Sequence, residues 1–496
     1  MGRWAFSVGF PLVPSTSEGP SPGFAPETGP LLRAAVAALA PQLDLLTELG
    51  RRFESAGHEL ALVGGPVRDA FLGRTSPDLD FTTDATPEQV LGLLSSWADA
   101  HWDIGRAFGT IGLRKGPAVI EITTYRADAY DRETRKPQVA FGRSLDEDLV
   151  RRDFTVNAMA LRLPSLEFVD RHDGLVDLAA RRLRTPATPE ESFADDPLRM
   201  MRAARFSAQL GFTVDGDVAA AMTARADTLA IVSAERIREE FTKLLLSVTP
   251  RAGLTLLVDT GLAEVFLPEL PALRLEVDEH HRHKDVYEHS LTVLEQAIAL
   301  ETDGPDLILR LAALLHDVGK PATRRFEAGG GVSFHHHELV GARMVTKRLK
   351  AMRYDKETVR EVARLVELHL RFHGYGDGQW TDSAVRRYVT DAGPLLLRLH
   401  ALTRSDCTTR NPRKAARLAR TYDELEDRIE RLAAEEELAA VRPELDGNEI
   451  GEILGIPPGP VIGEAYRFLL GLRLDEGPIG REAATARLRT WWQTRR

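Results

Sequence analysis

Cysteine is almost absent, since Cys407 is the single cysteine among 496 residues. A lone cysteine cannot form an intrachain disulfide or a cysteine-based zinc cluster, and this scarcity fits a reducing cytoplasm. Positive charge is also in deficit, because 64 Lys and Arg oppose 74 Asp and Glu, for a formal net charge of -10. This balance excludes a protein that coats nucleic acid with uniform positive charge, but it allows a local basic groove.

Long apolar runs are missing as well. No stretch reaches the roughly 18 apolar residues that span a bilayer, so we expect a cytoplasmic protein with no membrane partner. The apolar stretch from Trp4 to Val13 is interrupted by Pro11 and makes a poor signal peptide. Residues 1–30 are rich in Pro, Gly and Ser, and this composition predicts a disordered tail.

The remaining pattern predicts several domains. Leu and Ala recur at helical spacing over 31–56, and short apolar runs at 60–63, 80–83 and 118–124 predict strands. From about Ser192 the chain is predicted to be helical, and histidine is dense from 278 to 373. The expected domains are a disordered tail (1–30), an α/β head (31–175), a helical neck (176–275), a histidine-rich domain (276–412) and a helical tail (413–496).

The first candidate site combines a glycine turn with two aspartates. The pair Gly64-Gly65 closes a strand before a helix, and paired glycines let the backbone approach a phosphate closely, so Gly65 and Arg68 are suited to contact phosphates. Asp78 and Asp80 alternate in a strand, and both carboxylates therefore project from one face, where they can share Mg²⁺. Magnesium there would activate an attacking hydroxyl and stabilise departing pyrophosphate. The aspartate pair alone also fits a solvated strand end.

A third carboxylate is a candidate for the same metal site. Glu121 lies in an apolar strand between Ile120 and Ile122 and points to the face opposite to theirs. A carboxylate in such a place needs a partner, which a metal ion would supply. A strand glutamate that faces solvent on a half-exposed sheet fits the pattern equally well.

The segment from Arg151 to Ala158 packs cations, an acid and the amide of Asn157 closely together. Arg152 can hold a phosphate, and Asp153 can accept a hydrogen bond from a ribose hydroxyl, which would favour ribonucleotides. A capped, charged helix start is the alternative.

A second polar pattern follows in the neck. Asp196, Arg199, Arg202 and Arg205 recur every third residue and form one slowly drifting stripe on a helix. Asp196 and Arg199 together offer acceptors and donors that can mimic a Watson–Crick edge, so the protein itself could choose a base. A surface ladder of ion pairs is the alternative.

Taken together, these segments resemble the class II tRNA nucleotidyltransferase/poly(A) polymerase family. The resemblance covers roughly residues 45–270 and rests on LVGGPVRDAFLGRTSPDLDFTTDAT, RRDFTVNAMA, FVDRHDGLVDLAARRLRTP, DDPLRMMRAARFSAQLGF and ERIREEFTKLL. It implies an α+β fold: an N-terminal polymerase-β-like nucleotidyltransferase head with a mixed sheet, followed by an all-helical neck, histidine-rich domain and tail. The implied partners are a tRNA 3′ end, CTP and ATP, and not DNA.

The resemblance also implies roles for the candidate residues. Asp78 and Asp80 would hold magnesium, with Glu121 beside them, and Asp196 with Arg199 would recognise CTP or ATP. The expected nucleotide-binding residues are Gly65, Arg68, Arg152, Asp153, Asn157, Asp196, Arg199, Arg202 and Arg205. The family commonly has Glu-Asp where this chain has Asp195-Asp196, a change that we expect to be tolerated.

CCA-adding enzymes and poly(A) polymerases share the head motifs, so the choice between these two activities rests on two other features. The segment from Thr124 through Arg126 to Gln138 resembles the flexible loop that helps CCA-adding enzymes switch from CTP to ATP. The C-terminal tail lacks the long basic extension expected of a poly(A) polymerase, although Arg487 to Arg496 could still touch the tRNA backbone. Both features favour CCA addition.

The histidine-rich region carries a second candidate metal site. An apolar helix ends at His316-Asp317, with His289 upstream and Asp406 downstream, and this order resembles the HD phosphohydrolase family. His337 and His369 are possible ligands of a second metal. Mixed histidine and carboxylate ligands suit Mn, Ni, Fe or Zn better than Mg. Alternatively, these are structural histidines of a degenerate domain.

The sequence thus favours a CCA tRNA nucleotidyltransferase that adds C, C and A without a nucleic-acid template and releases pyrophosphate. Poly(A) polymerase is the first alternative. The second is a metal-dependent HD phosphohydrolase that acts on 2′,3′-cyclic or terminal phosphates.

Overall fold

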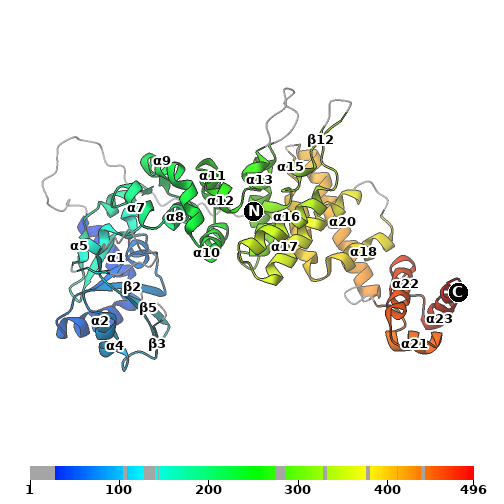
Figure 1. The fold of residues 1–496 in the computed structure, drawn as a ribbon, viewed down its shortest axis with the longest axis horizontal. Coiled ribbons are helices and arrows are strands. Elements are labelled where there is room, and N and C mark those ends of the chain that lie inside the picture. Colours follow the sequence, from blue (N-terminus) through cyan, green and yellow to red (C-terminus); the bar gives the residue numbers. More distant parts are fainter. Residues whose placement is uncertain are drawn as a thin grey trace. The chain divides into compact units, whose positions relative to one another are not determined.

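The computed structural model describes residues 28–103, 109–127, 140–142, 144–274, 285–327, 332–375, 380–409, 411–436 and 442–495. They form two compact units, divided between Leu175 and Val176. Figure 1 traces both units along the chain and labels their elements. Within the described residues, no helix combines the length and the apolar character needed to cross a membrane.

A seven-stranded sheet, in the order β3-β4-β5-β2-β1-β8-β9, organises the first unit. Its strands are β1 (Leu60–Val63), β2 (Asp78–Thr83), β3 (Ala100–Trp102), β4 (Thr110–Lys115), β5 (Ala118–Thr124), β8 (Met159–Leu163) and β9 (Glu167–Asp170). Strands β2 and β5 run parallel and the other neighbours antiparallel, so the predicted mixed sheet is confirmed. A separate antiparallel pair joins β6 (Arg126–Ala127) and β7 (Ala140–Phe141).

The two faces of this sheet differ in chemistry because successive side chains alternate. Leu62 pairs with Phe81, and Phe81 pairs with Ile122, so these three buried side chains share one face. On the opposite face, Asp80 pairs with Glu121. The sheet therefore buries an apolar layer on the first face, while the second face combines these carboxylates with a buried apolar cluster over β1, β8 and β9.

Helices flank the sheet in the first unit (Figure 1). They are α1 (Thr28–Ala38), α2 (Leu43–Ser55), α3 (Gly65–Phe71), α4 (Pro87–Leu94) and α5 (Leu145–Val150). Helix α2 packs against β1 and β8, and α4 packs against β4 and β5. Helix α1 begins at Thr28, so the predicted disordered tail of 1–30 is wrong for its last three residues; 1–27 lie outside the described residues.

The second unit is mainly helical. After α6 (Gly174–Ala179), which spans the division, its neck comprises α7 (Pro189–Asp195), α8 (Leu198–Leu210), α9 (Gly216–Arg225), α10 (Ala234–Leu245), α11 (Pro250–Asp259) and α12 (Leu262–Phe266). Pro197, Gly211, Pro250 and Gly261 each stand at the end of a helix. Gly211 ends α8 with a positive φ of 68°, which glycine adopts without steric cost.

The histidine-rich region packs helices around a buried centre. It contains α13 (Val286–Ala299), α14 (Leu307–Leu315), α15 (Lys320–Thr323), α16 (His337–Ala351), α17 (Lys356–Leu368), α18 (Asp382–Ala392) and α19 (Leu396–Ser405). The predicted helical character of the neck and the histidine-rich region is confirmed, and two short strand pairs accompany the helices. β10 (Arg182–Leu183) pairs with β11 (Thr213–Val214), and β12 (Arg325–Phe326) pairs with β13 (Val332–Ser333).

The helices after 412 belong to two packing groups. Helix α20 (Pro412–Glu436) packs on α18 and α19, where the Tyr422 hydroxyl donates to the Thr403 carbonyl over 2.6 Å. The helices α21 (Gly447–Leu454), α22 (Pro460–Glu476) and α23 (Arg481–Gln493) instead enclose a small apolar core of their own. Helix α20 thus begins one residue before the predicted helical tail (413–496), while 437–441 lie outside the described residues.

Candidate functional site

Three carboxylates share one face of the head sheet. Asp78 and Asp80 lie two residues apart on β2, and Asp80 pairs with Glu121 across the parallel β2–β5 ladder. Partial desolvation raises the pKa of the Glu121 carboxyl, and the negative charges of Asp80 and Asp78 raise it further. Crowded carboxylates of this kind are suited to bind a divalent cation, which would relieve their repulsion.

A glycine turn lies directly beside this acidic face. Gly64 joins β1 to α3 with φ 72° and ψ -136°, a backbone conformation that a side chain would strain. A Cβ atom on Gly64 would lie 3.2 Å from Nη1 of Arg152 and 3.8 Å from Oδ2 of Asp80. Within the predicted glycine pair, Gly64 is the residue whose missing side chain leaves room for the Arg152 guanidinium and the Asp80 carboxylate beside the turn. The contact of Gly65 with a phosphate stays a prediction.

Buried hydrogen bonds connect the predicted nucleotide-binding residues of the head. Arg68 Nη1 donates to Oδ1 of Asn157 over 2.7 Å, and Asn157 Nδ2 donates to Oδ1 of Asp153 over 2.9 Å. Arg152 donates from Nη2 to Oδ2 of the buried Asp148 over 3.0 Å. Asp148 escaped the sequence analysis because it lies on α5, outside the motif that it supports.

The candidate base-reading residues lie at the junction of α7 and α8. Asp196 Oδ1 accepts a hydrogen bond from the Leu198 amide over 3.1 Å, and Oδ2 accepts one from Arg236 Nη2 over 2.7 Å. Arg199 Nη1 donates to the carbonyl oxygen and Oγ of Ser192 over 3.1 and 3.0 Å. Asp196 and Arg199 are thus held by different partners, and the sequence analysis identified none of these contacts.

The other two arginines of the stripe contact one acid. Arg205 is buried and donates from Nε to Oε2 of Glu240, while Nη1 of Arg202 lies 3.8 Å from Oε1 of the same residue. The Arg202 side chain is 34% exposed. The stripe therefore packs α8 onto α10, and contacts of either arginine with a triphosphate stay predictions.

The histidine-rich region brings six candidate ligands into two adjoining groups: His289, His316 and Asp406; and Asp317, His337 and His369. In the first group, His289 Nε2 lies 3.0 Å from Oδ1 of Asp406 and 3.3 Å from Nε2 of His316. In the second, His337 Nε2 lies 3.2 Å from Oδ1 of Asp317.

Asp317 connects the two groups. Its Oδ1 faces His337, whereas its Oδ2 lies 3.2 Å from His316 Nε2 and 3.6 Å from His289 Nε2. The carboxylate can therefore bridge two metal ions. The sequence analysis assigned His316 and Asp317 to the same metal ion. The position of Asp317 would also let its other carboxylate oxygen contact a second metal ion.

The histidine rings are oriented as metal ligands require. Nδ1 of His316, His337 and His369 lies 2.9, 2.8 and 2.6 Å from a main-chain carbonyl oxygen in each case. Because a carbonyl oxygen only accepts, Nδ1 carries the proton in the neutral ring and Nε2 keeps its lone pair. Within the described residues, the buried Nε2 atoms of His337 and His369 receive no hydrogen bond from a donor, and both face Oδ1 of Asp317, so the residues fit a metal.

Charges inside this centre are strongly coupled. Burial opposes protonation of His316, but the Asp317 carboxylate outweighs it and raises the pKa of His316 to about 9. Burial and the neighbouring His316 lower the pKa of His369 to about 3. Burial opposes ionisation of Asp406, yet the hydrogen bond from His289 and the charge of His316 hold its pKa well below the usual range. The carboxylates of the centre therefore stay ionised, and a divalent cation would neutralise their negative charge.

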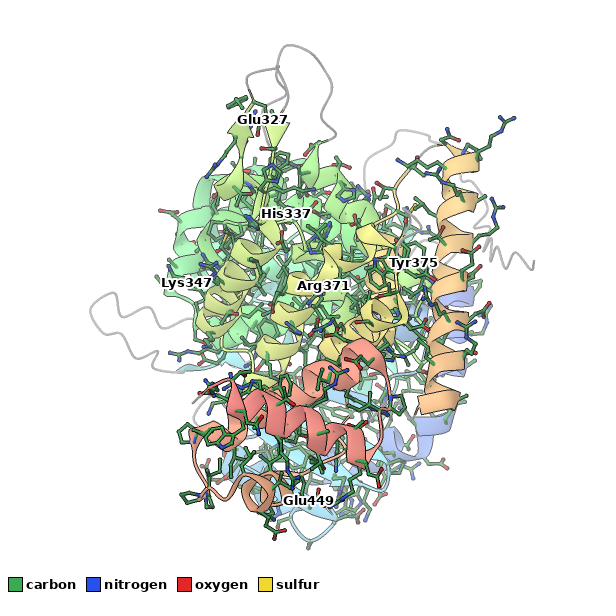
Figure 2. All side chains as sticks on the ribbon, turned by 90° about the vertical axis from the view of Figure 1, so that its right-hand side faces the viewer. Glu327, His337, Lys347, Arg371, Tyr375 and Glu449 are labelled. Atoms are coloured by element: carbon green, nitrogen blue, oxygen red, sulfur yellow. The ribbon has the colours of Figure 1, made fainter. Side chains whose placement is uncertain are left out.

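Close helix packing positions these ligands. A Cβ atom at Gly319 would lie 2.1 Å from the His337 carbonyl oxygen, so glycine allows the turn after Asp317 to touch the start of α16. In Figure 2, His337 lies among the helices, whereas Glu327 lies at the outer end of the β12–β13 pair.

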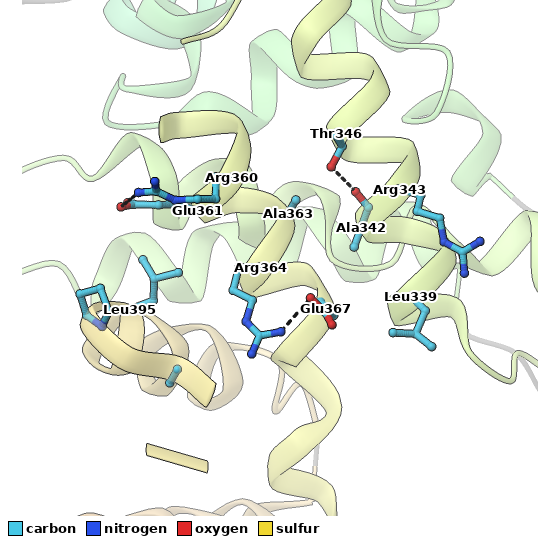
Figure 3. Close-up of a pocket in the computed structure, with 12 residues that line it drawn as sticks. Leu339, Ala342, Arg343, Thr346, Arg360, Glu361, Ala363, Arg364, Glu367 and Leu395 are labelled. Carbon is cyan, nitrogen blue, oxygen red and sulfur yellow. Dashed lines mark hydrogen bonds and ion pairs between the residues drawn. The ribbon is translucent and has the colours of Figure 1, made fainter. Parts of the chain in front are cut away.

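A separate groove lies on the same region, away from these ligands. It has a volume of 820 Å³ and is lined by α16, α17 and the segment that precedes α19, as Figure 3 shows. Its cations are largely neutralised: Arg364 pairs with Glu367 over 2.9 Å and Arg360 with Glu361 over 3.6 Å. None of the six candidate ligands lines it.

Two segments discussed from the sequence lie wholly or mostly outside the residues that the structure describes. Most of the proposed flexible loop between Thr124 and Gln138 lies outside the described residues. His280, His281 and His283, interpreted as surface residues, also lie outside them.

Known protein families match most of the chain. The poly A polymerase head domain matches residues 60–184, the probable RNA and SrmB-binding site of polymerase A matches 211–273, and the HD domain matches 286–411.

Individual relatives extend these matches. An A-adding tRNA nucleotidyltransferase of Deinococcus radiodurans is 35% identical over 419 residues, which are 83% of this chain and 91% of that protein. A CCA-adding enzyme of Levilactobacillus brevis is 35% identical over 277 residues, 55% of this chain and 68% of that protein. The structure of the Bacillus stearothermophilus CCA-adding enzyme in complex with CTP is 25% identical, has a TM-score of 0.66, and covers 92% of this chain and 98% of its own.

Proposed function

The chain belongs to the tRNA nucleotidyltransferase/poly(A) polymerase family, and we propose that it adds C, C and A in turn to the 3′ end of tRNA, using CTP and ATP and releasing pyrophosphate. The observation that carries this proposal is the acidic face of β2 and β5 beside the Gly64 turn. Such an arrangement combines metal-binding carboxylates with a backbone that a triphosphate can approach closely.

In this proposal the head performs the transfer. Asp78 and Asp80 hold Mg²⁺, and Glu121 supports them from the adjacent strand. The bound metal supplies Lewis acidity that lowers the pKa of the tRNA 3′ hydroxyl and neutralises charge on the leaving pyrophosphate. Arg68 and Arg152 orient the triphosphate beside Gly65.

The sugar and the base are recognised by other residues. Asp153, held by Asn157, accepts a hydrogen bond from the ribose, and Asp196 with Arg199 in the neck selects the base. Arg202 and Arg205 support the triphosphate side. Template-independent synthesis requires such recognition, since the protein must replace the edge of a complementary base.

Addition of the terminal A alone is a second candidate function, because the relative that matches 83% of this chain is an A-adding enzyme. Incorporation assays on tRNA transcripts that lack one, two or three terminal nucleotides separate these activities. With CTP and ATP in magnesium, addition of C, C and A to the shortest transcript supports the first proposal. Extension only of the transcript that already ends in CC supports A addition. Long A tails on unrelated RNA would mean a poly(A) polymerase.

A further part of the proposal concerns the HD domain, where His289, His316, Asp406 and Asp317 hold one divalent transition metal, and Asp317, His337 and His369 hold a second. The buried Nε2 atoms of His337 and His369, which both face Oδ1 of Asp317, support this assignment. Mn, Ni, Fe and Zn match these ligands. Hydrolysis of 2′,3′-cyclic or terminal phosphates is the accompanying activity, and assays with 2′,3′-cyclic AMP and each metal test it. Metal binding without hydrolysis would mean that the metal centre of the HD domain has a structural role only.

A further inference from the structure

One short segment contacts both ring nitrogens of His289. Nδ1 of His289 lies 3.1 Å from Oγ1 of Thr408, and Nε2 lies 3.0 Å from Oδ1 of Asp406. His289 lies near the start of α13, whereas Asp406 and Thr408 directly follow α19, against which α13 packs. A hydroxyl 119 residues away in sequence is therefore the partner of a candidate metal ligand.

Thr408 differs in kind from the partners of the other candidate histidines. Nδ1 of His316, His337 and His369 faces a main-chain carbonyl oxygen, which only accepts a hydrogen bond. A threonine hydroxyl both donates and accepts, so Thr408 can pair with Nδ1 in either tautomer of His289. When Nε2 carries the proton, the hydroxyl donates to Nδ1; when Nε2 offers its lone pair, Nδ1 donates to the hydroxyl. Thr408 therefore stays bonded whether or not the ring acts as a ligand.

Contacts between α19 and α20 hold the residues that carry this hydroxyl. Arg404, near the end of α19, donates from Nη2 to Oδ1 of Asp423 and to Oε2 of Glu426, over 2.8 Å in each case. Both acids belong to α20, the next helix of the chain. Because these ion pairs tie the end of α19 to α20, Thr408 approaches His289 from a defined position.

We propose that Thr408 is a positioning residue for the first metal position, that of His289, His316 and Asp406: its hydroxyl orients the His289 ring and pairs with Nδ1 while Nε2 serves as a ligand. This inference rests on the proposed metal binding by the HD domain. Without the hydroxyl, Nδ1 loses its hydrogen bond and the ring loses the contact that fixes its orientation. The second metal position should not depend on Thr408, because main-chain carbonyl oxygens orient both of its histidines.

The test measures Mn²⁺ affinity by isothermal titration calorimetry in the full-length protein, in two backgrounds that isolate the two positions. In His337→Ala, which keeps the first position, Thr408→Val should weaken Mn²⁺ binding by about tenfold or more, the usual effect of removing the partner of a ligating histidine. In His289→Ala, which keeps the second position, the same change should alter the affinity by less than about twofold, because the ring that Thr408 orients is gone.

A rescue variant and a matched control separate positioning from a general loss of structure. Thr408→Ser retains a hydroxyl at the same place and should restore most of the Mn²⁺ affinity that Thr408→Val loses. Thr346→Val makes the same change in α16, where the hydroxyl donates to the Ala342 carbonyl oxygen of its own helix. This control should leave the Mn²⁺ affinity of both backgrounds unchanged.

Three outcomes would overturn the inference: equal weakening in both backgrounds, no weakening in His337→Ala, or no recovery with Thr408→Ser. If neither background binds Mn²⁺, the two positions are inseparable and the otherwise wild-type chain decides. There Thr408→Val should still weaken Mn²⁺ binding and Thr408→Ser should restore it, and an unchanged affinity of Thr408→Val would overturn the inference. A wild type that binds none of Mn²⁺, Ni²⁺, Fe²⁺ and Zn²⁺ would instead contradict the proposed metal binding itself.

Discussion

Arg68 and Asn157 are 89 residues apart in sequence, yet Arg68 Nη1 donates to the Asn157 side-chain oxygen over 2.7 Å inside the head. Asn157 simultaneously donates to Asp153 over 2.9 Å. One amide thus ties the proposed phosphate-binding arginine to the proposed ribose-binding acid. An amide suits this place because it offers an acceptor to the cation and a donor to the carboxylate.

Asn157→Ala is expected to impair the binding of CTP and ATP equally. The variant leaves Arg68 and Asp153 without a shared partner, and we expect the KM for both nucleotides to rise about tenfold. Loss of these buried hydrogen bonds should also lower the free energy of unfolding by ~1–3 kcal/mol. Steady-state kinetics and urea denaturation measure the two effects. Asn448→Ala, at an exposed asparagine, is the control, and a selective effect on one nucleotide would argue against this shared role.

Gly64→Ala is expected to reduce nucleotide addition through two effects. The backbone at Gly64, with φ 72° and ψ -136°, lies in a region that is essentially restricted to glycine, which costs another residue about 1–3 kcal/mol, and the added Cβ would lie 3.2 Å from Arg152 Nη1. Gly57→Ala is the control, because Gly57 also has a positive φ, 77°, but nothing within 4 Å of the added atom. Both variants should lose stability in thermal denaturation. Only Gly64→Ala should raise the KM for nucleotide, and equal kinetics for the two would remove Gly64 from the site.

Local sequence patterns predicted much of the backbone. The strand at 118–124 was predicted with the bounds that β5 has, because its apolar alternation is limited by Gly116 and Pro117 on one side. The start of helix α20 at Pro412 was harder to place from local pattern. Its first turns are rich in Arg and Lys and lack the apolar spacing that identifies a helix.

Side-chain partners were less predictable than backbone elements. Spacing within one strand or helix predicted that Asp78 and Asp80 share a face. The partner of Asp196 is Arg236, 40 residues away, and packing of α10 against the junction of α7 and α8 decides that pair. The order of the HD-type ligands was readable in the sequence, but the bridging position of Asp317 depends on where α16 and α17 place His337 and His369. Long-range contacts of this kind leave no periodic signal.

Glu121→Gln is expected to stabilise the metal-free protein while weakening magnesium binding. The pKa of Glu121 is raised from 4.5, so the folded state disfavours its charged form. Wild-type stability therefore declines as pH rises through the raised pKa, and the variant avoids this decline. In EDTA at pH 7 the variant should have the higher Tm, and this difference should vanish below about pH 4, where the glutamate is protonated in both folded and unfolded chains.

Magnesium should reverse the order of the two melting temperatures, so that the wild type has the higher Tm. It should raise the Tm of the wild type more than that of Glu121→Gln, because the cation relieves repulsion only where the third carboxylate is present. Nucleotide addition by the variant should also require more magnesium. Unchanged magnesium dependence would identify Glu121 as a solvent-facing strand residue, the alternative that its sequence pattern left open.

Substitutions in the HD domain should separate its two metal positions. His337→Ala removes a ligand of one group and His289→Ala a ligand of the other, so each variant should lose one of two bound metal ions, measured by elemental analysis after reconstitution with Mn²⁺. Asp317→Asn should weaken both positions because its carboxylate faces both groups.

His400 provides the control for these variants, since it is a buried histidine outside both groups and pairs with Glu426 over 3.2 Å. His400→Ala should retain the wild-type metal content even if its Tm falls. Nucleotide addition should stay near the wild-type rate in His289→Ala and His337→Ala, because the proposed transfer site lies in the head and neck. Loss of both metals from His337→Ala alone, with a circular dichroism spectrum like that of the wild type, would show that the ligands form one indivisible cluster rather than two positions bridged by Asp317.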